Sequence, residues 1–328
     1  MASKTAAMLS AVALLFASWV SAQCPNEVAV YHPTLRSMTV NSSWFIVPVP
    51  STAAQKALDD FYGIGKVSLA PVPTTDTTLF PSGFPSSDHP VLVSSGFDDD
   101  IRQSVLQIDG ALLVGSVYVP YVRRAGASAN SILTAPLNNY LVGENGNAIS
   151  ALVPSTVSTL IEGIFVRLGM NVPADAAYQL NSNGVLSNKV AWDLLPNPIT
   201  GPGVYPEVLD FQYEAADSFT TVTAKLFKVV LNQPVILYGA YFVAGQCQRM
   251  QYYFNNSTGA MLPRFGNVTL GPAADGLVVQ LTGTLQQASP DGSGFYSGLQ
   301  GFSACAQNLN YNVESCDSAA MNVDPTSL

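Results

Sequence analysis

Histidine and charged residues are scarce in this chain. His32 and His89 are its only histidines, and the four charged residue types make up 11% of its 328 residues. The sequence contains no G-x-S-x-G elbow, no H-E-x-x-H pair, no P-loop and no dinucleotide fingerprint between a strand and a helix. These absences argue against a serine hydrolase triad, zinc hydrolysis and hydride transfer, so we expect neither a metal nor a cofactor.

Basic residues are also few. Lysine and arginine number 13 against 22 acidic residues, which gives a formal net charge of −9. Nucleic acid and anionic membranes bind clustered positive charge, so this balance argues against both as partners. Beyond the N-terminus, no apolar run approaches the roughly 18 residues of a membrane helix. We therefore expect no membrane span.

The first 22 residues have the pattern of a secretory signal peptide. Lys4 supplies the positive charge, residues 6–20 form a short apolar segment, and the small residues VSA precede Gln23 at the expected cleavage point. We therefore expect a secreted, extracellular protein whose mature chain begins at Gln23. The remainder, residues 23–328, is expected to form a single β-rich domain.

Four cysteines remain after such a cleavage, and an even number in an oxidising compartment predicts two disulfides. Their spacing does not suit a zinc site. Of the three possible pairings we favour Cys305–Cys316, as a local link within an irregular tail that begins at Ser289. That choice leaves Cys24–Cys247 to hold the N-terminus.

Four N-x-S/T sequons accompany the signal peptide and predict a glycoprotein. The same serines and threonines also suit turns. The sequons begin at Asn41, Asn255, Asn256 and Asn267. Glycosylation of this kind implies a eukaryote, and the richness in alanine, serine, threonine and asparagine is typical of a fungal protein.

One long amphipathic helix is predicted from Ser155 to Gly169. Its apolar residues recur at i, i+3, i+4, i+7, i+8 and i+11, which is the pattern of a single buried face. Ser155 suits the N-cap and Gly169 suits the C-terminal end, whereas Gly163 weakens the interior. The helix either completes the core as a plug or closes one end of a cavity.

The rest of the chain is typical of strands and tight turns. Asp109-Gly110 and Asn183-Gly184 are strong hairpin signals, each between two strands. A short helix is predicted at 52–61. Many antiparallel strands with one long and one short helix predict a mainly β fold, either an antiparallel barrel or a strongly curved sandwich. The predicted strands are 40–50, 66–72, 104–108, 111–122, 131–142, 148–153, 177–180, 185–195, 208–213, 219–231, 235–243, 248–254 and 277–287.

Asp98, Asp99 and Asp100 form the only acidic run. The spacing and the glutamate of an EF-hand calcium loop are missing, so we expect a solvated turn there rather than a metal site.

The candidate catalytic residues are polar groups able to orient an apolar ligand inside a barrel. An acid beside aromatic residues, such as Glu207, can have a raised pKa and act as a general acid. The alternative is that these residues only pack or face solvent, since tyrosine is common in strands. The candidates are Tyr118, Arg123, Trp192, Tyr205, Glu207 and Tyr213.

The segment WFIVPVPSTAAQKALDDFYGIGKVSLAPVP, residues 44–73, resembles the strand–short helix–strand opening of the acetoacetate decarboxylase-like barrel family. The helix predicted at 155–169 also follows the central strands, as in that family. The resemblance implies a barrel and decarboxylation through a Schiff-base lysine. The family's lysine pair just after that helix is missing here, and the nearest lysine is Lys189.

As a whole, the chain also resembles secreted, glycosylated fungal proteins of natural-product pathways. Among them are hetero-Diels–Alder cyclases that join a terpene to a polyketide-derived quinone methide. This resemblance implies catalysis without a cofactor, in a shaped apolar cavity where a few hydrogen-bond donors hold two reactants in register.

Three functions are therefore considered. The leading hypothesis is a secreted, cofactor-independent cyclase or pericyclase that acts on small hydrophobic molecules in fungal secondary metabolism. The second is a non-catalytic extracellular carrier of a hydrophobic ligand. The third is an acetoacetate decarboxylase-like enzyme that uses Lys189.

Overall fold

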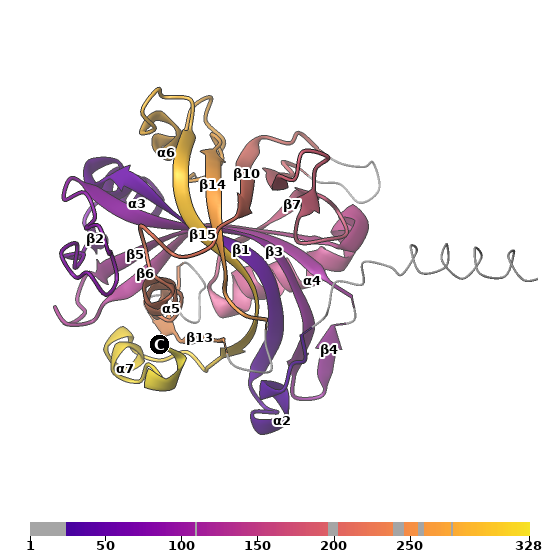
Figure 1. Cartoon of the computed structure of the whole chain (residues 1–328). Helices are drawn as coiled ribbons and strands as arrows, with labels where there is room; N and C mark the ends of the chain where they lie inside the picture. Colours follow the sequence, from indigo (N-terminus) through magenta and orange to yellow (C-terminus); the bar gives the residue numbers. More distant parts are fainter. Residues whose placement is uncertain (1–23, 109, 196–202, 239–245, 255–258, 277) are drawn as a thin grey trace, which may run out of the picture.

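The computed structural model describes residues 24–108, 110–195, 203–238, 246–254, 259–276 and 278–328. The proposed signal peptide and the sequons at Asn255 and Asn256 lie outside these residues. The described chain is mainly β, with nine strands closed into a barrel and a few short helices around it (Figure 1). The prediction of a mainly β, barrel-like fold is confirmed.

Neighbouring barrel strands are antiparallel except for β6 and β7, which are parallel. A parallel pair needs a crossover connection, and the chain supplies it through a helix, α4 (Ala148–Val157). The ring closes where β5 pairs with β6. In ring order the strands are β6 (Leu133–Gly143), β7 (Val166–Val172), β9 (Leu186–Trp192), β10 (Glu207–Ala215), β14 (Leu262–Leu270), β15 (Phe295–Asn310), β1 (Arg36–Pro50), β3 (Asp88–Gln103) and β5 (Leu112–Arg124).

The barrel interior is filled by side chains. Phe45 of β1 meets Phe211 and Tyr213 of β10 at ring-centroid distances of 5.7 and 5.3 Å, although two other strands separate β1 from β10 along the wall. Gly115 of β5 faces Val190 of β9 so closely that a Cβ there would lie 2.7 Å from a Val190 methyl group. These contacts across the barrel identify the inward face of the sheet.

The opposite, outward face of the same strands is also buried. Trp44 of β1 stacks on Phe302 of β15 at 4.8 Å, and Phe227 packs against Phe302 at 4.7 Å. Phe227 belongs to α5 (Ala224–Leu231), which covers this part of the wall. Because alternate residues of a strand point to opposite faces, a strand covered on both sides is buried almost throughout, as β1 is.

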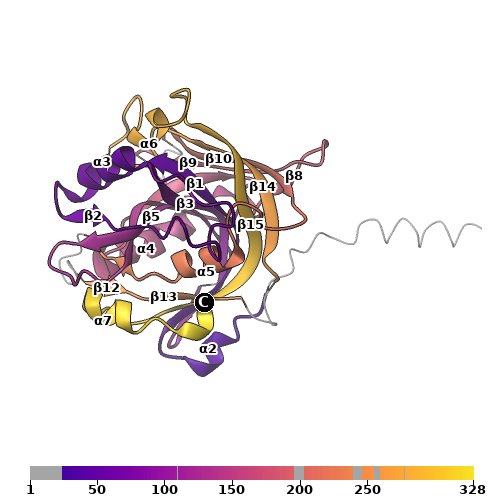
Figure 2. The same ribbon diagram turned by 60° about the vertical axis from the view of Figure 1, so that its left-hand side comes forward.

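Two helices lie at one end of the barrel, at the upper left in Figures 1 and 2. They are α3 (Ser51–Tyr62) and α6 (Thr284–Gln287). Ala54, Leu58 and Phe61 of α3 are buried in the cluster that fills the barrel. The helix predicted at 52–61 is thus confirmed. None of the helices in the described residues is long and apolar enough to cross a bilayer.

The long helix predicted at 155–169 begins and ends earlier than expected. The structure has α4 followed by a π-helical turn, η2 (Ser158–Glu162). Asn147 is the N-cap, and its side chain accepts from the backbone N–H groups of Ile149 and Ser150 at 3.1 and 3.4 Å. Gly163, at φ 76°, ends the helix, because the left-handed conformation is open to glycine. Residues 148–153, which were predicted to form a strand, lie within α4, so that prediction is wrong.

Residues after this helix form β7, a strand hydrogen-bonded on both sides. Leu168 is the i+11 position of the apolar pattern from which the helix was predicted, and it is buried by the sheet instead. In a strand that is buried on both faces, a run of apolar residues can match the 3.6-residue period of a helix by chance. Periodicity in the sequence could not distinguish this strand from a helix.

Three further elements differ from prediction. The strand predicted at 219–231 is helix α5, capped by Thr223, whose hydroxyl accepts from the Leu226 N–H at 3.2 Å. The strand predicted at 277–287 appears in the structure only as the short helix α6. The irregular tail expected from Ser289 contains the 16-residue strand β15. β15 joins β14 to β1, so it is part of the barrel wall.

The two hairpin signals have different outcomes, and Asp109 of the first lies outside the described residues. β8 (Gln179–Leu180) pairs with β9 across Asn183-Gly184, as predicted. β4 (Leu106–Ile108) pairs with β3 rather than with β5, and β5 continues along β3. The strands predicted at 40–50, 131–142, 208–213 and 248–254 are confirmed as β1, β6, β10, β12 (Cys247–Gln248) and β13 (Met250–Tyr253). Smaller strands are β2 (Val67–Leu69) and β11 (Val235–Ile236).

The four cysteines form two disulfides, as expected, but the favoured pairing is wrong. The bonds are Cys24–Cys305 and Cys247–Cys316, with Cα–Cα distances of 6.1 and 4.7 Å. Cys305 lies within β15 and pairs there with Asn41 of β1, so it is held away from Cys316 by the sheet. Cys316 begins α7 (Cys316–Met321), which the bond fixes to β12.

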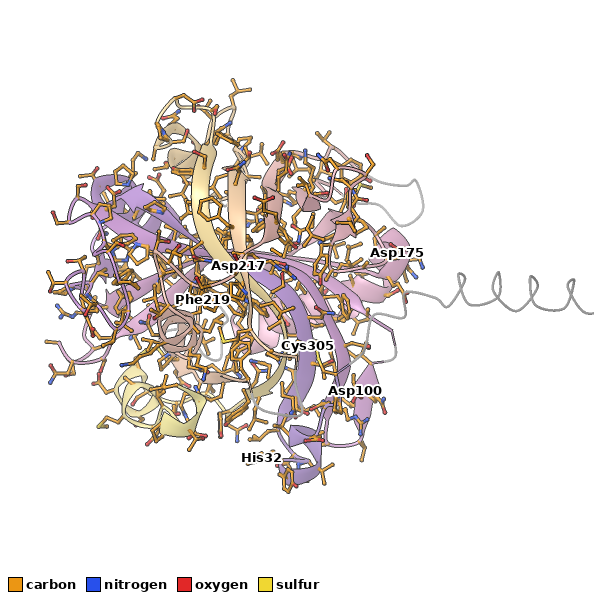
Figure 3. All side chains as sticks on the ribbon, in the orientation of Figure 1. His32, Asp100, Asp175, Asp217, Phe219 and Cys305 are labelled. Atoms are coloured by element: carbon orange, nitrogen blue, oxygen red, sulfur yellow. A yellow bond between two sulfur atoms is a disulfide. The ribbon has the colours of Figure 1, made fainter. Side chains whose placement is uncertain are left out.

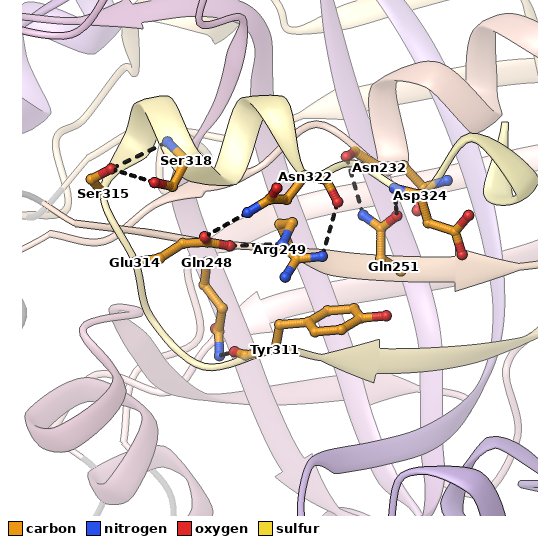
Figure 4. Close-up of polar contacts among 10 residues, drawn as sticks. All are labelled: Asn232, Gln248, Arg249, Gln251, Tyr311, Glu314, Ser315, Ser318, Asn322 and Asp324. Carbon is orange, nitrogen blue, oxygen red and sulfur yellow. Dashed lines mark hydrogen bonds and ion pairs between the residues drawn. The ribbon is translucent and has the colours of Figure 1, made fainter.

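Arg249 holds the C-terminal segment beside β13 (Figure 4). Its Nε donates to Glu314 at 2.7 Å and its Nη1 donates to the Asn322 carbonyl at 2.9 Å. The guanidinium also lies 3.9 Å from the centroid of the Tyr311 ring. An acid, a backbone carbonyl and an aromatic ring therefore each contact this cation.

Candidate functional site

A cavity of about 580 Å³ lies on the outward face of the barrel wall. This volume is in the range of sites for small organic ligands. Its floor consists of alternate residues of neighbouring strands, among them Met38, Val40 and Trp44 of β1 and Leu112 and Val114 of β5. The walls are mostly apolar, so the cavity suits a ligand that is itself mostly apolar.

The crossover helix covers the cavity. Ser150, Val153, Pro154 and Val157 of α4 and Ser158 of η2 all line it. The second sequence-based interpretation of this helix, that it closes a cavity, therefore agrees with its position, although its residue range was wrong. Of the ionisable residues other than tyrosine, Arg36 and Asp98 line this cavity.

A fixed set of hydrogen bonds runs along the polar side of the cavity. The Tyr118 hydroxyl donates to Asn139 Oδ1 at 2.7 Å. Asn310 Nδ2 donates to Asn308 Oδ1 at 2.7 Å, and Arg36 Nη2 donates to Asn310 Oδ1 at 3.3 Å. Because these groups hold one another, they present a ligand with polar atoms in defined positions.

Asp98 is the group in the cavity that titrates near neutral pH. It lies on β3, where Val40 and Leu112 are its strand neighbours. Burial raises the pKa of its carboxyl from 3.8 to about 7, and the charge of Arg36 lowers it only in part. The pKa of Tyr118 is raised to about 12 by burial, and that of Tyr252 is also raised. At neutral pH, Asp98 can therefore donate or accept a proton while both phenols keep theirs.

The prediction of a solvated turn at Asp98–Asp100 is wrong. All three residues belong to β3, and Asp99 is 8% exposed. Asp100 lies toward the outer end of the strand near β4, where it pairs with Arg102 at 2.6 Å (Figure 3). Three consecutive aspartates are unusual in a strand, which is why the sequence suggested a turn. Among the residues that the structure describes, no group of three or more histidine, cysteine or acidic side chains could hold a metal ion.

The six candidates named from the sequence do not form one site. Tyr118 lines the cavity. Tyr213 lies inside the barrel, with its hydroxyl 2.6 Å from Ser43 Oγ, and Trp192 packs against Arg167. The others are half-buried away from the cavity: Arg123 at the end of β5, Tyr205 before β10 and Glu207 at the start of β10.

Lys189 is held on the barrel wall by two carboxylates. Its Nζ is 3.0 Å from Asp210 and 3.6 Å from Glu207, and it does not line the cavity. Burial alone lowers the pKa of this amine, but Asp210 and Glu207 more than offset that effect, so its pKa is raised. A Schiff-base lysine needs a lowered pKa, so this geometry gives the decarboxylase hypothesis no support.

The sequence-based reasoning missed the polar residues that reach the cavity from β1, β3, β6 and β15. One signal was available. If the segment around Asp98 is a strand, its side chain points to the same face as Ser94 and Gly96, which precede it by four and two residues, and that face is the cavity side of β3. The residues missed are Arg36, Asp98, Asn139, Asn308 and Asn310.

No protein-family model and no curated protein matches the sequence. Among solved structures, the enduracididine biosynthesis enzyme MppR is similar in three forms. Its complex with pyruvate has a TM-score of 0.47 and 8% identity, over 86% of this chain and 90% of that chain. Its complex with the condensation product of pyruvate and imidazole 4-carboxaldehyde has a TM-score of 0.47 and 8% identity, over 86% of this chain and 89% of that chain. Its HEPES-bound form has a TM-score of 0.45 and 9% identity, over 85% of this chain and 86% of that chain. Similarity at this level does not identify a family for the chain.

Proposed function

We propose that this protein is a secreted, cofactor-independent enzyme that binds small hydrophobic molecules in the cavity under α4 and joins two of them into a ring. The observation that carries the proposal is the carboxyl of Asp98 in the wall of a mostly apolar cavity, beside the fixed Tyr118–Asn139 hydrogen bond. An acid held at a pKa near neutrality in apolar surroundings is the arrangement that general acid catalysis requires.

The reaction we propose is a hetero-Diels–Alder addition of the kind used in fungal secondary metabolite biosynthesis. A conjugated C=C–C=O unit and an alkene form one C–C and one C–O bond. Three π bonds become one, no atom leaves and no oxidant or reductant is needed. The apolar walls would hold the two partners together, which replaces a bimolecular encounter by a unimolecular step.

In this mechanism the protonated Asp98 donates a hydrogen bond to the carbonyl oxygen of the heterodiene. The donation withdraws electron density from the diene and lowers the barrier to addition. Tyr118 and Arg36 place further polar atoms on the same side of the cavity and would fix which face of the diene reacts. Catalysis should then require the acid form, so turnover should decrease as the pH rises through about 7.

The test uses the source organism. Deleting the gene should remove a product, or make it racemic, while its precursors accumulate in the medium, as measured by mass spectrometry after a chiral column. The accumulated precursors then serve as substrates for the purified protein. Asp98→Asn should lower turnover by about 100-fold or more, with the remaining rate independent of pH. Asp217→Asn, the same change at an exposed carboxylate (Figure 3), should change neither value. Equal rates and pH profiles in both variants would exclude Asp98 as the acid.

A carrier of a hydrophobic ligand is the second candidate, and the mostly apolar lining of the cavity favours it. A carrier would retain one ligand through purification and release it unchanged. Asp98→Asn would then leave binding intact, and the gene deletion would leave the handedness of every secreted compound unchanged.

A further inference from the structure

The cavity opens to solvent between two segments that carry exposed apolar side chains. Val153 of α4 and Leu106 of β4 both line the cavity, yet they are 69% and 70% exposed. Side chains that border a cavity and also face solvent lie at its mouth. The mouth is therefore between α4 and the β3–β4 hairpin, which lie on the same side of the barrel, at the right in Figure 1.

Large apolar side chains continue outward from this mouth on both segments. At the tip of the hairpin, Val105 is 97% exposed and directly precedes Leu106. The helical segment is apolar on its outer side, where a surface helix normally carries charged or polar residues. Single exposed apolar residues are common, but a group of them around one opening marks an interaction surface. This apolar rim consists of Val105, Leu106, Ile149, Leu152, Val153, Val157 and Leu160.

Neither segment of the apolar rim carries a charged residue. Residues 103–108 and 148–161 contain no aspartate, glutamate, lysine or arginine. The rim thus offers no charge with which a charged partner could pair. The formal net charge of −9 over the whole chain also repels an anionic surface. The surface that this rim fits is therefore apolar and uncharged.

We propose that the apolar rim docks the protein on an uncharged lipid bilayer, from which the cavity takes its hydrophobic ligand directly. A second copy of the chain, or another protein, seated on the rim would cover the mouth of the cavity. A bilayer that receives the rim instead gives an apolar ligand a path into the cavity that avoids water. The ligand class that follows is a molecule dissolved in lipid. The transfer of ligand rests on the hydrophobic binding proposed above, whereas the docking needs only the rim and holds equally for a carrier.

The experiment measures sedimentation of the purified protein with phosphatidylcholine vesicles. The mature chain from Gln23 is used, because the apolar segment of residues 6–20 would bind lipid by itself. The wild type should bind saturably, and phosphatidylserine in the vesicles should weaken its binding.

Two rim residues that do not line the cavity serve for the variants. Val105→Ser and Ile149→Ser should each lower the vesicle affinity by about tenfold, because burial of one such side chain accounts for about that factor. Ile64→Ser is the matched control. Ile64 is an exposed isoleucine that follows α3 and lies outside the rim, so this variant should bind as the wild type does.

Tryptophan fluorescence gives a second reading, which reports the position of the contact. Brominated phosphatidylcholine should quench the fluorescence that Val105→Trp adds to the protein, and it should not quench the fluorescence that Ile64→Trp adds.

Four outcomes would each overturn the proposal. They are no sedimentation of the wild type, equal sedimentation of the two serine variants of the rim, equal quenching at positions 105 and 64, and a wild-type dimer that the two serine substitutions together convert to a monomer. In the last case the rim joins two copies of the chain. None of these measurements depends on turnover, so the docking and the proposed cyclisation can fail separately.

Discussion

The raised pKa of Asp98 predicts an unusual dependence of stability on pH. In the folded protein this carboxyl keeps its proton up to about pH 7, whereas in the unfolded chain it releases the proton near pH 3.8. The folded state therefore binds more protons across that interval. Its free energy of unfolding should decrease as the pH rises from about 4 to about 7, and this contribution should be constant above that range.

The size of the effect follows from the two pKa values. A tenfold difference in ionisation constant corresponds to about 1.4 kcal/mol, so the interval from 3.8 to about 7 sets an upper bound of about 4 kcal/mol. The Asp98 side chain is partly exposed to the cavity, and water there would solvate the carboxylate. We therefore expect about 2 kcal/mol.

The measurement is urea unfolding of wild type and Asp98→Asn at intervals between pH 4 and 8.5. The asparagine side chain cannot ionise, so the variant should be more stable than the wild type by about 2 kcal/mol at pH 8.5 and equal to it at pH 4. Asp217→Asn should show no such divergence, since its carboxylate is exposed. If the difference between Asp98→Asn and the wild type does not change with pH, then Asp98 ionises in the fold as it does in water, and the catalytic proposal loses its acid.

Three other substitutions test the architecture around the site. Arg249→Met removes the contacts to Glu314 and the C-terminal segment and should lower the free energy of unfolding by about 1–3 kcal/mol. Hydrogen exchange over residues 314–328 should accelerate. Unchanged exchange would show that the Cys247–Cys316 disulfide alone holds this segment. Asn147→Ala removes the N-cap of α4 and should cost about 1 kcal/mol, with faster exchange confined to residues 148–162. Val114→Trp fills the cavity, so the circular dichroism spectrum should be preserved while ligand binding is lost; retained binding would place the ligand elsewhere.

The sequence was sufficient for the fold class because strand periodicity and turn residues act locally. β1 and α3 were predicted within a few residues, since Pro50 and Gly63 separate the helix from its neighbours whatever the tertiary context. β15 was missed for the opposite reason. Its small and polar residues carry little strand preference of their own, and the segment is a strand because β14 and β1 hydrogen-bond to it from both sides.

The site depended on facts that no local pattern contains. Asp98 and Asn308 are more than 200 positions apart in the sequence, yet both line the same cavity because β3, β1 and β15 are neighbours in the wall. Tyr118 was identified only because tyrosine near a strand end is a reasonable guess for a pocket. Residues from several strands can be placed on one cavity only once the order of the strands is known.

The position of β15 has a consequence for how the chain is made. Strand β1 pairs on one side with β3, which follows soon after it, and on the other side with β15, more than 240 residues later. During synthesis one edge of the long strand β1 must therefore stay unpaired until nearly the whole chain has left the ribosome. Open edges of this kind invite pairing with other chains, and contacts this distant in sequence form slowly. A chain truncated before Phe295 would keep most of its residues and would still expose two strand edges, β1 and β14, so we expect such fragments to aggregate rather than to fold into a smaller barrel.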